Sequence, residues 1–226
     1  MGNFRGLPPE LFTFFEGLEA DNSKTYWDAN KTTWETKVQG PVQDLLTDLE
    51  EEFGSLRTFR PNRDVRFSQD KSPYKTWTGI ASSDRAVGGI GYFLRLEASG
   101  LRMAGGAMVM AKDQIERFRA AIDHPVYGPE FDEMVKKLDK KSLTVTGGKE
   151  PALAKVPPKY AKDHPRGEYL RWKGAVVVKE FPVAKWMHTA KAIDKVREVW
   201  KGTEPLKEWI DEHVGASQEP ASRRPR

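Results

Sequence analysis

Hydrophobic residues near the start of the chain recur with the spacing of amphipathic helices. A first apolar stripe follows Pro8-Pro9, and proline is favoured in the first turn of a helix. The residues of this stripe are Leu11, Phe14, Phe15 and Leu18. A longer helical pattern begins after the capping residues Asp21-Asn22-Ser23 and ends at Gly54. The pattern predicts two helices, the second kinked at Gly40-Pro41.

The middle of the chain changes to the two-residue alternation of β-strands. Over residues 90–97, apolar side chains occupy every second position, which is typical of a half-buried strand. Ser99-Gly100 predicts a tight turn into a further strand over Leu101–Met110. Trp77–Ser82 is expected to form a short strand before this pair, and Ala175–Val178 an interior strand after it. The strands of the middle region are predicted to form an antiparallel meander.

Helical spacing returns in the second half of the chain. The four segments that carry it are Ile115–Ile122, Phe131–Leu138, Val183–Ile193 and Leu206–His213. Runs of strands bracketed by runs of helices predict an α+β fold, with an antiparallel sheet of about four to six strands and helices packed mainly on one face. Residues 1–214 are expected to form a single α+β domain, because no repeat or linker interrupts them. Residues 215–226 lack periodicity and are expected to be a disordered C-terminal tail.

Composition restricts the class of protein. The chain has 226 residues, 38% of them hydrophobic, with seven Trp and eleven Phe, which suffices for a sizeable core. The absence of cysteine excludes disulfides and thiolate metal sites. No stretch approaches the roughly 18 apolar residues of a membrane helix, and the N-terminus lacks the apolar run of a signal peptide. We therefore expect a soluble, cytoplasmic protein with no membrane partner.

The net charge of +4 is distributed unevenly. Arg60–Lys75 carries +3, Lys155–Lys173 carries +4 and residues 215–226 carry +2, so the remainder is acidic at −5. Positive charge confined to two internal segments is typical of a local anion site, whereas a nucleic-acid-binding stripe would spread basic residues over a face. The Arg-rich tail is interpreted as a solvated terminus.

The first basic segment is the chemically densest part of the sequence. Residues 60–76 read R-P-N-R-D-V-R-F-S-Q-D-K-S-P-Y-K-T. If Arg63–Phe67 is extended, Asp64, Arg66 and Ser68 share one face, so the carboxylate can pair with the guanidinium and orient it. An oriented guanidinium is a good bidentate ligand for phosphate or carboxylate.

The second half of this segment is expected to be a structured loop. Ser72-Pro73 favours an extended or turn geometry, and Lys71 and Lys75 would place two more cations near the same edge. Composition alone fits an anion site and a salt-bridged structural loop equally well.

The run R-D-V-R-F-S-Q-D-K-S-P-Y-K-T resembles the signature of the domain of unknown function 2461 family. Further matches lie in Pro157–Tyr160, Asp163–Arg166 and Tyr169–Gly174, and the resemblance extends from about Leu7 to Val214. It implies a one-domain cytoplasmic protein and brings no activity, substrate or cofactor with it. Charged and polar residues in a family signature more often mark binding than packing. The resemblance therefore favours a site formed by Arg63, Asp64, Arg66, Ser68, Asp70, Lys71, Tyr74 and Lys75.

The second basic segment contributes further candidates. His164 precedes a proline and is either a general acid or base or a loop histidine bonded to a nearby carbonyl. Arg171 and Lys173 would approach an anion from this segment. Trp77 and Trp172 each adjoin a basic segment and are either core residues or stacking surfaces for a base or ring.

Three hypotheses for function remain open. The first is an anion site for a phosphorylated small molecule or nucleotide; in an enzyme, Asp70 or His164 would transfer the proton. The second is a non-catalytic module that binds nucleic acid or an acidic protein, and the third is a purely structural signature. No P-loop, dinucleotide-binding or nucleophile-elbow motif is present. No histidines have metal-ligand spacing, so neither a metal nor a cofactor is predicted.

Overall fold

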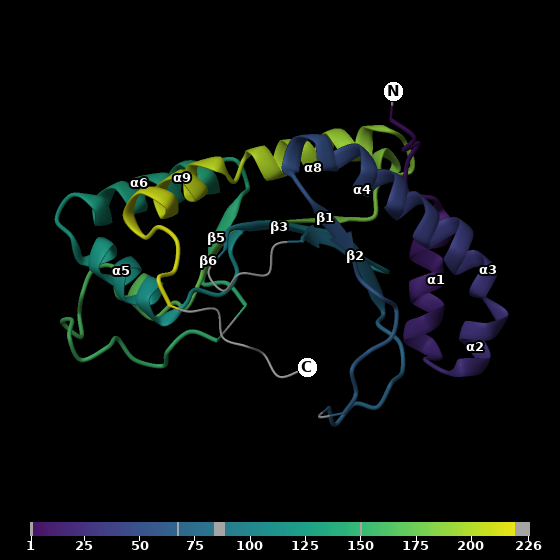
Figure 1. Ribbon diagram of the computed structural model, residues 1–226, viewed down its shortest axis with the longest axis horizontal. Helices are drawn as coiled ribbons and strands as arrows, with labels where there is room; N and C mark the ends of the chain where they lie inside the picture. The colour runs from purple at the N-terminus through teal and green to yellow at the C-terminus, as the bar shows by residue number, and fades with distance from the viewer. Residues whose placement is uncertain (1, 67, 84–88, 150, 220–226) are drawn as a thin grey trace. The chain divides into compact units, whose positions relative to one another are not determined.

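The structure is a computed structural model that describes residues 2–66, 68–83, 89–149 and 151–219. Its contacts divide the chain into two compact units. Unit 1 comprises Met1–Ser83, Tyr92–Met103 and Glu180–Glu198. Unit 2 comprises Asp84–Gly91, Ala104–Lys179 and Val199–Arg226 (Figure 1). The expectation of one domain over residues 1–214 remains a prediction.

A six-stranded antiparallel sheet confirms the predicted α+β class, and its strand order is β1-β2-β3-β4-β6-β5. The strands are β1 (Leu56–Thr58), β2 (Trp77–Ser82), β3 (Gly91–Glu97), β4 (Gly100–Ala107), β5 (Thr144–Thr146) and β6 (Ala175–Pro182). Four of them, β2, β3, β4 and β6, lie where the sequence predicts strands. The sequence does not reveal β1 and β5, because each has three residues, too few for an alternating pattern.

The predicted N-terminal helices are present, but the second is divided. The segments are α1 (Pro9–Ala20), α2 (Lys24–Ala29), α3 (Lys31–Thr33), the π-helix η1 (Trp34–Gln39) and α4 (Gly40–Phe53). The Ser23 hydroxyl caps α2 by accepting a hydrogen bond from the backbone N–H of Tyr26 at 3.1 Å. The π-helical turn ends directly before Gly40-Pro41, where proline cannot donate an α-helical hydrogen bond. Gly54, at φ +75°, terminates α4.

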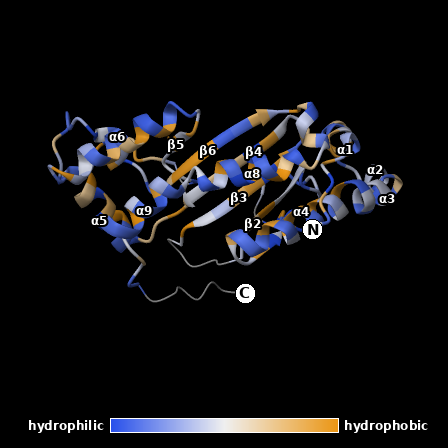
Figure 2. Ribbon diagram, turned by 90° about the horizontal axis from the view of Figure 1, so that it is seen from above, coloured by the Kyte–Doolittle hydropathy of each residue, from blue (hydrophilic) through white to orange (hydrophobic). Residues whose placement is uncertain are grey.

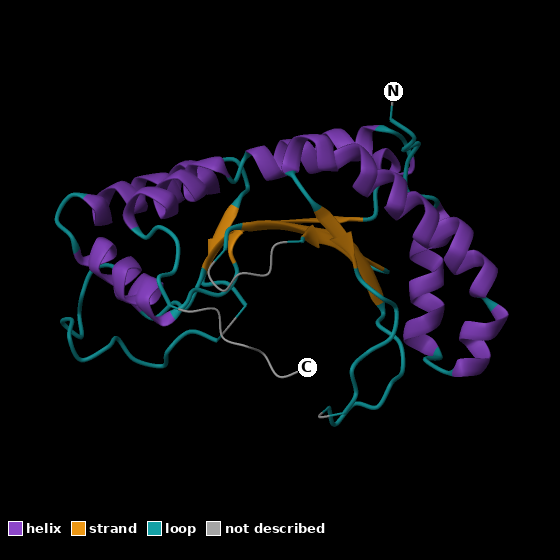
Figure 3. Cartoon of the chain, in the orientation of Figure 1, coloured by secondary structure: helices purple, strands orange, loops and turns teal. Residues whose placement is uncertain are grey.

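Helices α4 and α8 (Lys191–Lys201) cover one face of strands β1–β3 in unit 1 (Figure 3). Along both helices hydrophobic and hydrophilic residues alternate, as in Figure 2. The apolar positions of helices and strands meet in a core that is closed to solvent. Its fully buried residues include Phe15, Leu18, Leu45, Leu49, Ile80, Leu94 and Leu96.

Unit 2 is built around an aromatic cluster. Its helices are α5 (Lys112–Asp123), α6 (Tyr127–Asp139), α7 (Gly167–Leu170) and α9 (Glu204–His213). The ring centroids of Phe118 and Phe131 are 5.8 Å apart, and those of Phe131 and Trp209 are 4.7 Å apart. Three predicted helices are therefore confirmed as α5, α6 and α9, whose apolar stripes meet in one core.

One predicted helix is wrong in its limits. Val183–Ile193 was expected to be helical, but the structure has a 3₁₀ turn, η2 (Lys185–His188), followed by α8. Ala184 and Thr189 have extended backbones on either side of this turn. Among the apolar residues of this segment, Met187 is buried, and Leu7 donates its backbone N–H to the Met187 carbonyl at 2.8 Å, whereas Val183 is exposed.

The beginning of the C-terminal segment is held against α5. Gln114 donates to the Gly215 carbonyl at 2.8 Å, and the Asp113 carboxylate accepts from the Ser217 hydroxyl at 2.9 Å and the Gln218 N–H at 2.8 Å. These contacts join residues about a hundred positions apart in the chain. The disordered tail over residues 215–226 remains a prediction. Residues 220–226 lie outside the described residues.

No helix among the described residues combines the length and the apolar composition needed to cross a membrane.

Leu45→Ala is expected to destabilise the protein by about 2–5 kcal/mol, because Leu45 is fully buried and the substitution leaves a cavity. Urea denaturation followed by circular dichroism measures this loss. The control is Gln43→Ala, an exposed position in the same helix, which should change stability by no more than about 0.5 kcal/mol. Equal losses in both variants would show that α4 does not bury the face described here.

Candidate functional site

The basic segment predicted from sequence, Arg60–Lys75, forms a loop between β1 and β2 of unit 1 (Figure 1). Its two ends pair in antiparallel fashion through an isolated bridge between Asn62 and Tyr74. The Arg63 N–H donates to the Pro73 carbonyl at 2.9 Å, and the Lys75 N–H donates to the Pro61 carbonyl at 2.8 Å. The base of the loop is therefore a narrow two-stranded ribbon.

Tyr74 anchors this ribbon to the N-terminal helices. Its side chain is only 8% exposed and stacks on Trp27, with centroids 4.3 Å apart and planes 10° from parallel. The Asn22 side chain accepts from the Tyr74 N–H and donates to the Tyr74 carbonyl, both at 3.1 Å. Tyr74 was predicted to bind a ligand, but this burial favours a structural role.

The pair between Asp64 and Arg66 forms as the sequence suggested, in irregular backbone rather than a strand. Arg66 Nε donates to Asp64 Oδ1 at 2.9 Å, and Nη2 donates to Oδ2 at 2.7 Å. The hydrogen bonds from the Arg66 side chain and backbone lower the pKa of Asp64 from 3.8 to about 2. Both side chains remain exposed, so the pair orients the guanidinium without burying it. Nearby, the Ser68 N–H closes a turn on the Val65 carbonyl at 3.4 Å.

Asp70 is the centre of a second pair in the loop. Its carboxylate accepts from the Ser72 hydroxyl at 2.6 Å, from the Ser72 N–H at 2.9 Å and from Arg63 Nη1. These bonds, those from Ser72 first, hold the pKa of Asp70 well below its usual value. A carboxylate this acidic is a weak proton acceptor at neutral pH, so the geometry does not favour Asp70 as a general base.

Three cations gather at the base of the loop. Lys75 Nζ donates to the Arg60 carbonyl at 2.6 Å and to the Asn62 carbonyl. Burial, and next the charges of Arg60 and Arg63, lower the pKa of Lys75. The shift shows that Arg60 and Arg63 lie close enough to Lys75 to repel its charge, although Asp70 pairs with Arg63. Lys71 lies further along the loop and donates to the Val65 carbonyl at 3.0 Å.

An aromatic cluster flanks the loop on the sheet face opposite α4 and α8. Phe59 and Trp77, which immediately precede and follow residues 60–76, have centroids 5.0 Å apart. Phe93 on β3 lies 5.9 Å from Phe59 and 6.1 Å from Trp77. The guanidinium of Arg57 lies 4.7 Å from the Phe59 centroid, and that of Arg95 lies 5.1 Å from the Trp77 centroid. Sequence analysis considered Trp77 for stacking but missed its neighbours: Phe93 lies in a strand predicted from alternation, whereas Phe59 follows the three-residue strand β1, which the sequence does not reveal.

The second basic segment lies in unit 2. His164 Nε2 is 3.2 Å from Asp123 Oδ1, and His164 Nδ1 accepts from the Arg166 N–H at 3.0 Å. Both ring nitrogens are thus engaged and the side chain is only 10% exposed, which favours the structural interpretation of His164. The Arg171 and Lys173 carbonyls accept backbone bonds from Leu153 and Met110, at 2.8 and 2.9 Å. These two predicted ligand cations therefore belong to a different unit from the loop.

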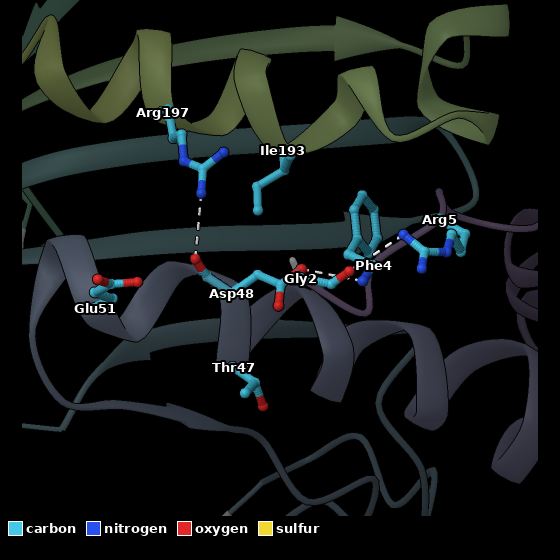
Figure 4. Close-up of a pocket in the computed structure, with 8 residues that line it drawn as sticks. All are labelled: Gly2, Phe4, Arg5, Thr47, Asp48, Glu51, Ile193 and Arg197. Atoms are coloured by element: carbon cyan, nitrogen blue, oxygen red, sulfur yellow. Dashed lines mark hydrogen bonds between the residues drawn. The ribbon is translucent and has the colours of Figure 1, made fainter.

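Among the described residues, cavities also lie away from this loop, one of them in unit 1 and another in unit 2. The first, about 500 Å³ in unit 1, is shown in Figure 4 and lies between the N-terminal segment, α4 and α8. Asp48 accepts there from the backbone N–H groups of Asn3 and Phe4, at 3.1 and 3.0 Å, and Arg197 pairs with Glu52 at 3.0 Å. The second, about 340 Å³ in unit 2, is bordered by a stack in which Tyr127 lies between His124 and His213. Within the described residues no group of three or more histidine or acidic side chains is placed to hold a metal ion.

Asn22→Ala should loosen the loop, because it removes both hydrogen bonds to the Tyr74 backbone. We expect a loss of about 1–3 kcal/mol in unfolding free energy and faster hydrogen exchange at the Tyr74 amide. Thr13→Ala on exposed α1 surface is the control and should leave both quantities nearly unchanged. Unaltered exchange in Asn22→Ala would show that the loop is not held at this point.

The Asp64 carboxyl should titrate in an NMR pH series with a midpoint near 2. Because its pKa is lowered in the folded state, the pair contributes stability above about pH 4, and this contribution is lost as the pH falls through 2. Arg66→Gln should return the midpoint toward 3.8, whereas Arg102→Gln, elsewhere in unit 1, should not. A midpoint near 3.8 in the unmodified protein would contradict the pairing.

Comparison with known proteins identifies a family and no characterised relative. A family model described as conserved hypothetical protein (DUF2461) matches residues 10–209. No curated protein and no solved structure is significantly similar to the chain. The match spans nearly all of both units and includes the loop, whose run R-D-V-R-F-S-Q-D-K-S-P-Y-K-T resembles the family signature. The chain belongs to the domain of unknown function 2461 family.

Proposed function

We propose that this protein binds a phosphate-bearing ligand through the loop Arg60–Lys75. The observation that carries the proposal is the group of three cations at the base of the loop, where the Lys75 ammonium donates to the Arg60 and Asn62 carbonyls beside Arg63. Burial, and next the charges of Arg60 and Arg63, lower the pKa of Lys75. Unlike a pair of opposite charges, such a group gains energy when an anion binds between its members. The net charge of +3 on Arg60–Lys75 is opposite in sign to the charge of a phosphate group.

Hydrogen-bond capacity supports the same ligand class. An ammonium group has three N–H donors, and two of those on Lys75 are used by the Arg60 and Asn62 carbonyls. The third is available to a ligand oxygen. Arg63 is held by Asp70, and Arg66 is held by Asp64, so each guanidinium has a defined orientation before the ligand arrives. Groups that are already ordered lose less conformational entropy on binding.

The proposal is for binding rather than for proton transfer. Neither candidate acid or base is well suited to catalysis, since the Asp70 carboxylate is strongly acidified and both nitrogens of His164 are engaged. Anchoring of the loop by Tyr74 is compatible with a binding role and with a purely architectural one. The two roles predict different effects of removing the exposed cation Arg60. A binding role predicts weaker ligand binding, and an architectural role predicts a lower melting temperature with an unchanged ligand response.

A thermal-shift series with inorganic pyrophosphate and nucleoside triphosphates tests this proposal. A ligand at a hundred times its dissociation constant stabilises by about 2.7 kcal/mol, which is a rise of about 5–10 °C for a chain of this size. Arg60→Ala should weaken binding by about 10- to 150-fold, the loss of one charge-assisted hydrogen bond.

The matched control is Lys31→Ala, which removes one exposed positive charge from α3 of the same unit. It should bind as the unmodified protein does. An absence of any shift, or an equal loss of binding in both variants, would overturn the proposal. A lower melting temperature in Arg60→Ala with an unchanged ligand response would support the architectural role.

A further inference from the structure

The sheet face of unit 1 that α4 and α8 do not cover combines aromatic rings with arginines. In the strand register Arg57 lies opposite Ala81, which lies opposite Phe93, and Trp77 lies opposite Glu97. Side chains alternate between the faces of a sheet, so these residues share one face, while Ile80 and Leu94 point to the helix-covered core. The aromatic and arginine side chains are half-buried, unlike the fully closed residues on the other face.

This face is continuous with the basic loop. Phe59 and Trp77 are the last residue before and the first residue after Arg60–Thr76, so the chain passes directly from the rings into the cationic segment. The base of the loop is closed by the pairing of residues 61–63 with residues 73–75, which keeps its cations next to the rings. Aromatic rings and phosphate-binding cations therefore adjoin within a single unit.

We infer that this face binds single-stranded nucleic acid, with unpaired bases stacked on Phe59, Trp77 and Phe93 and the phosphates contacted by the loop. The inference rests on the proposed phosphate binding and names its ligand. Stacking of bases on aromatic side chains beside a positively charged path for the backbone is the general mode of single-strand recognition. Arg57 lies over Phe59 and Arg95 over Trp77, with Arg95 oriented by its ion pair with Glu97 on the same face, so guanidinium groups border the rings.

The shape of the surface favours a strand over a free nucleotide or a duplex. Small ligands are typically bound in cavities that enclose most of their surface, whereas neither of the two cavities described above is lined by these rings, which share a sheet face with exposed loop residues among those the structure describes. A duplex keeps its bases stacked on each other and offers no ring face to Trp77. Several rings beside several cations fit a ligand that repeats the unit of base and phosphate.

Fluorescence anisotropy with labelled ten-residue oligothymidylate and oligouridylate tests the inference, with a duplex of equal length as competitor. Trp77→Leu should weaken binding of the single strands by about 5- to 150-fold, the usual loss of one stacked base, and Trp77→Phe should retain most of it. Binding of inorganic pyrophosphate should be unchanged in both variants. Arg60→Ala should weaken the binding of oligonucleotide and pyrophosphate alike.

Trp186→Leu is the matched control, because Trp186 packs on Phe181 in the same unit and is not part of the ring cluster. It should leave oligonucleotide binding unchanged. If Trp77→Leu fails to fold, ultraviolet cross-linking of oligouridylate to the unmodified protein decides the matter, because adducts should map to Phe59, Trp77 or Phe93. Adducts elsewhere would overturn the inference.

The outcomes separate the two proposals. Binding of pyrophosphate without any binding of single strands would overturn the stacking inference and leave phosphate binding standing. Equal affinity for duplex and single strand would also overturn it, because stacking requires unpaired bases. Failure of every anion to bind would overturn both. A salt dependence with a log–log slope of about −0.7 per phosphate contacted is the expected signature of the strand.

Discussion

The attachment of Tyr74 to the N-terminal helices determines where the basic loop lies. Stacking on Trp27 buries the Tyr74 ring. The Asn22 side-chain amide bonds both the N–H and the carbonyl of Tyr74, as the backbone of a neighbouring strand would. The other contacts described for the loop lie within the loop itself: backbone hydrogen bonds across its base, and ion pairs between largely exposed groups, which contribute little to stability. Its position therefore depends on one buried aromatic residue rather than on its many charges.

The charges of the loop are organised around that attachment. Each of its two aspartates orients one arginine, and these pairs keep both carboxylates ionised through their lowered pKa values. The remaining positive charge is concentrated at the base, where Lys75 is partly buried beside Arg60. Within the described part of the chain, the ordered base of the loop and positive charge thus occur at the same place, as the proposed anion site would require. The aromatic face begins where this base ends.

Much of the fold could be predicted from sequence, and the limits of that prediction have physical causes. Long periodic segments such as α1, α4 and β3 were correctly placed, because they bury one continuous face. The three-residue strands were invisible, since their pairing is decided by neighbours distant in the chain. The Val183–Ile193 prediction failed because apolar residues of a 3₁₀ turn and of the following helix happen to have helical spacing, although the backbone is extended at Ala184 and Thr189.

For the candidate site, the sequence by itself determined the residue types, the net positive charge and the pairing of Asp64 with Arg66, because that pair is separated by two residues. Only the tertiary structure decided that Tyr74 is an anchor, that His164 is engaged at both nitrogens, and that Phe59, Trp77 and Phe93 form one surface. Local pairs depend on spacing along the chain and can be read from it. Contacts between segments depend on how strands pair and helices pack, and these are properties of the whole fold.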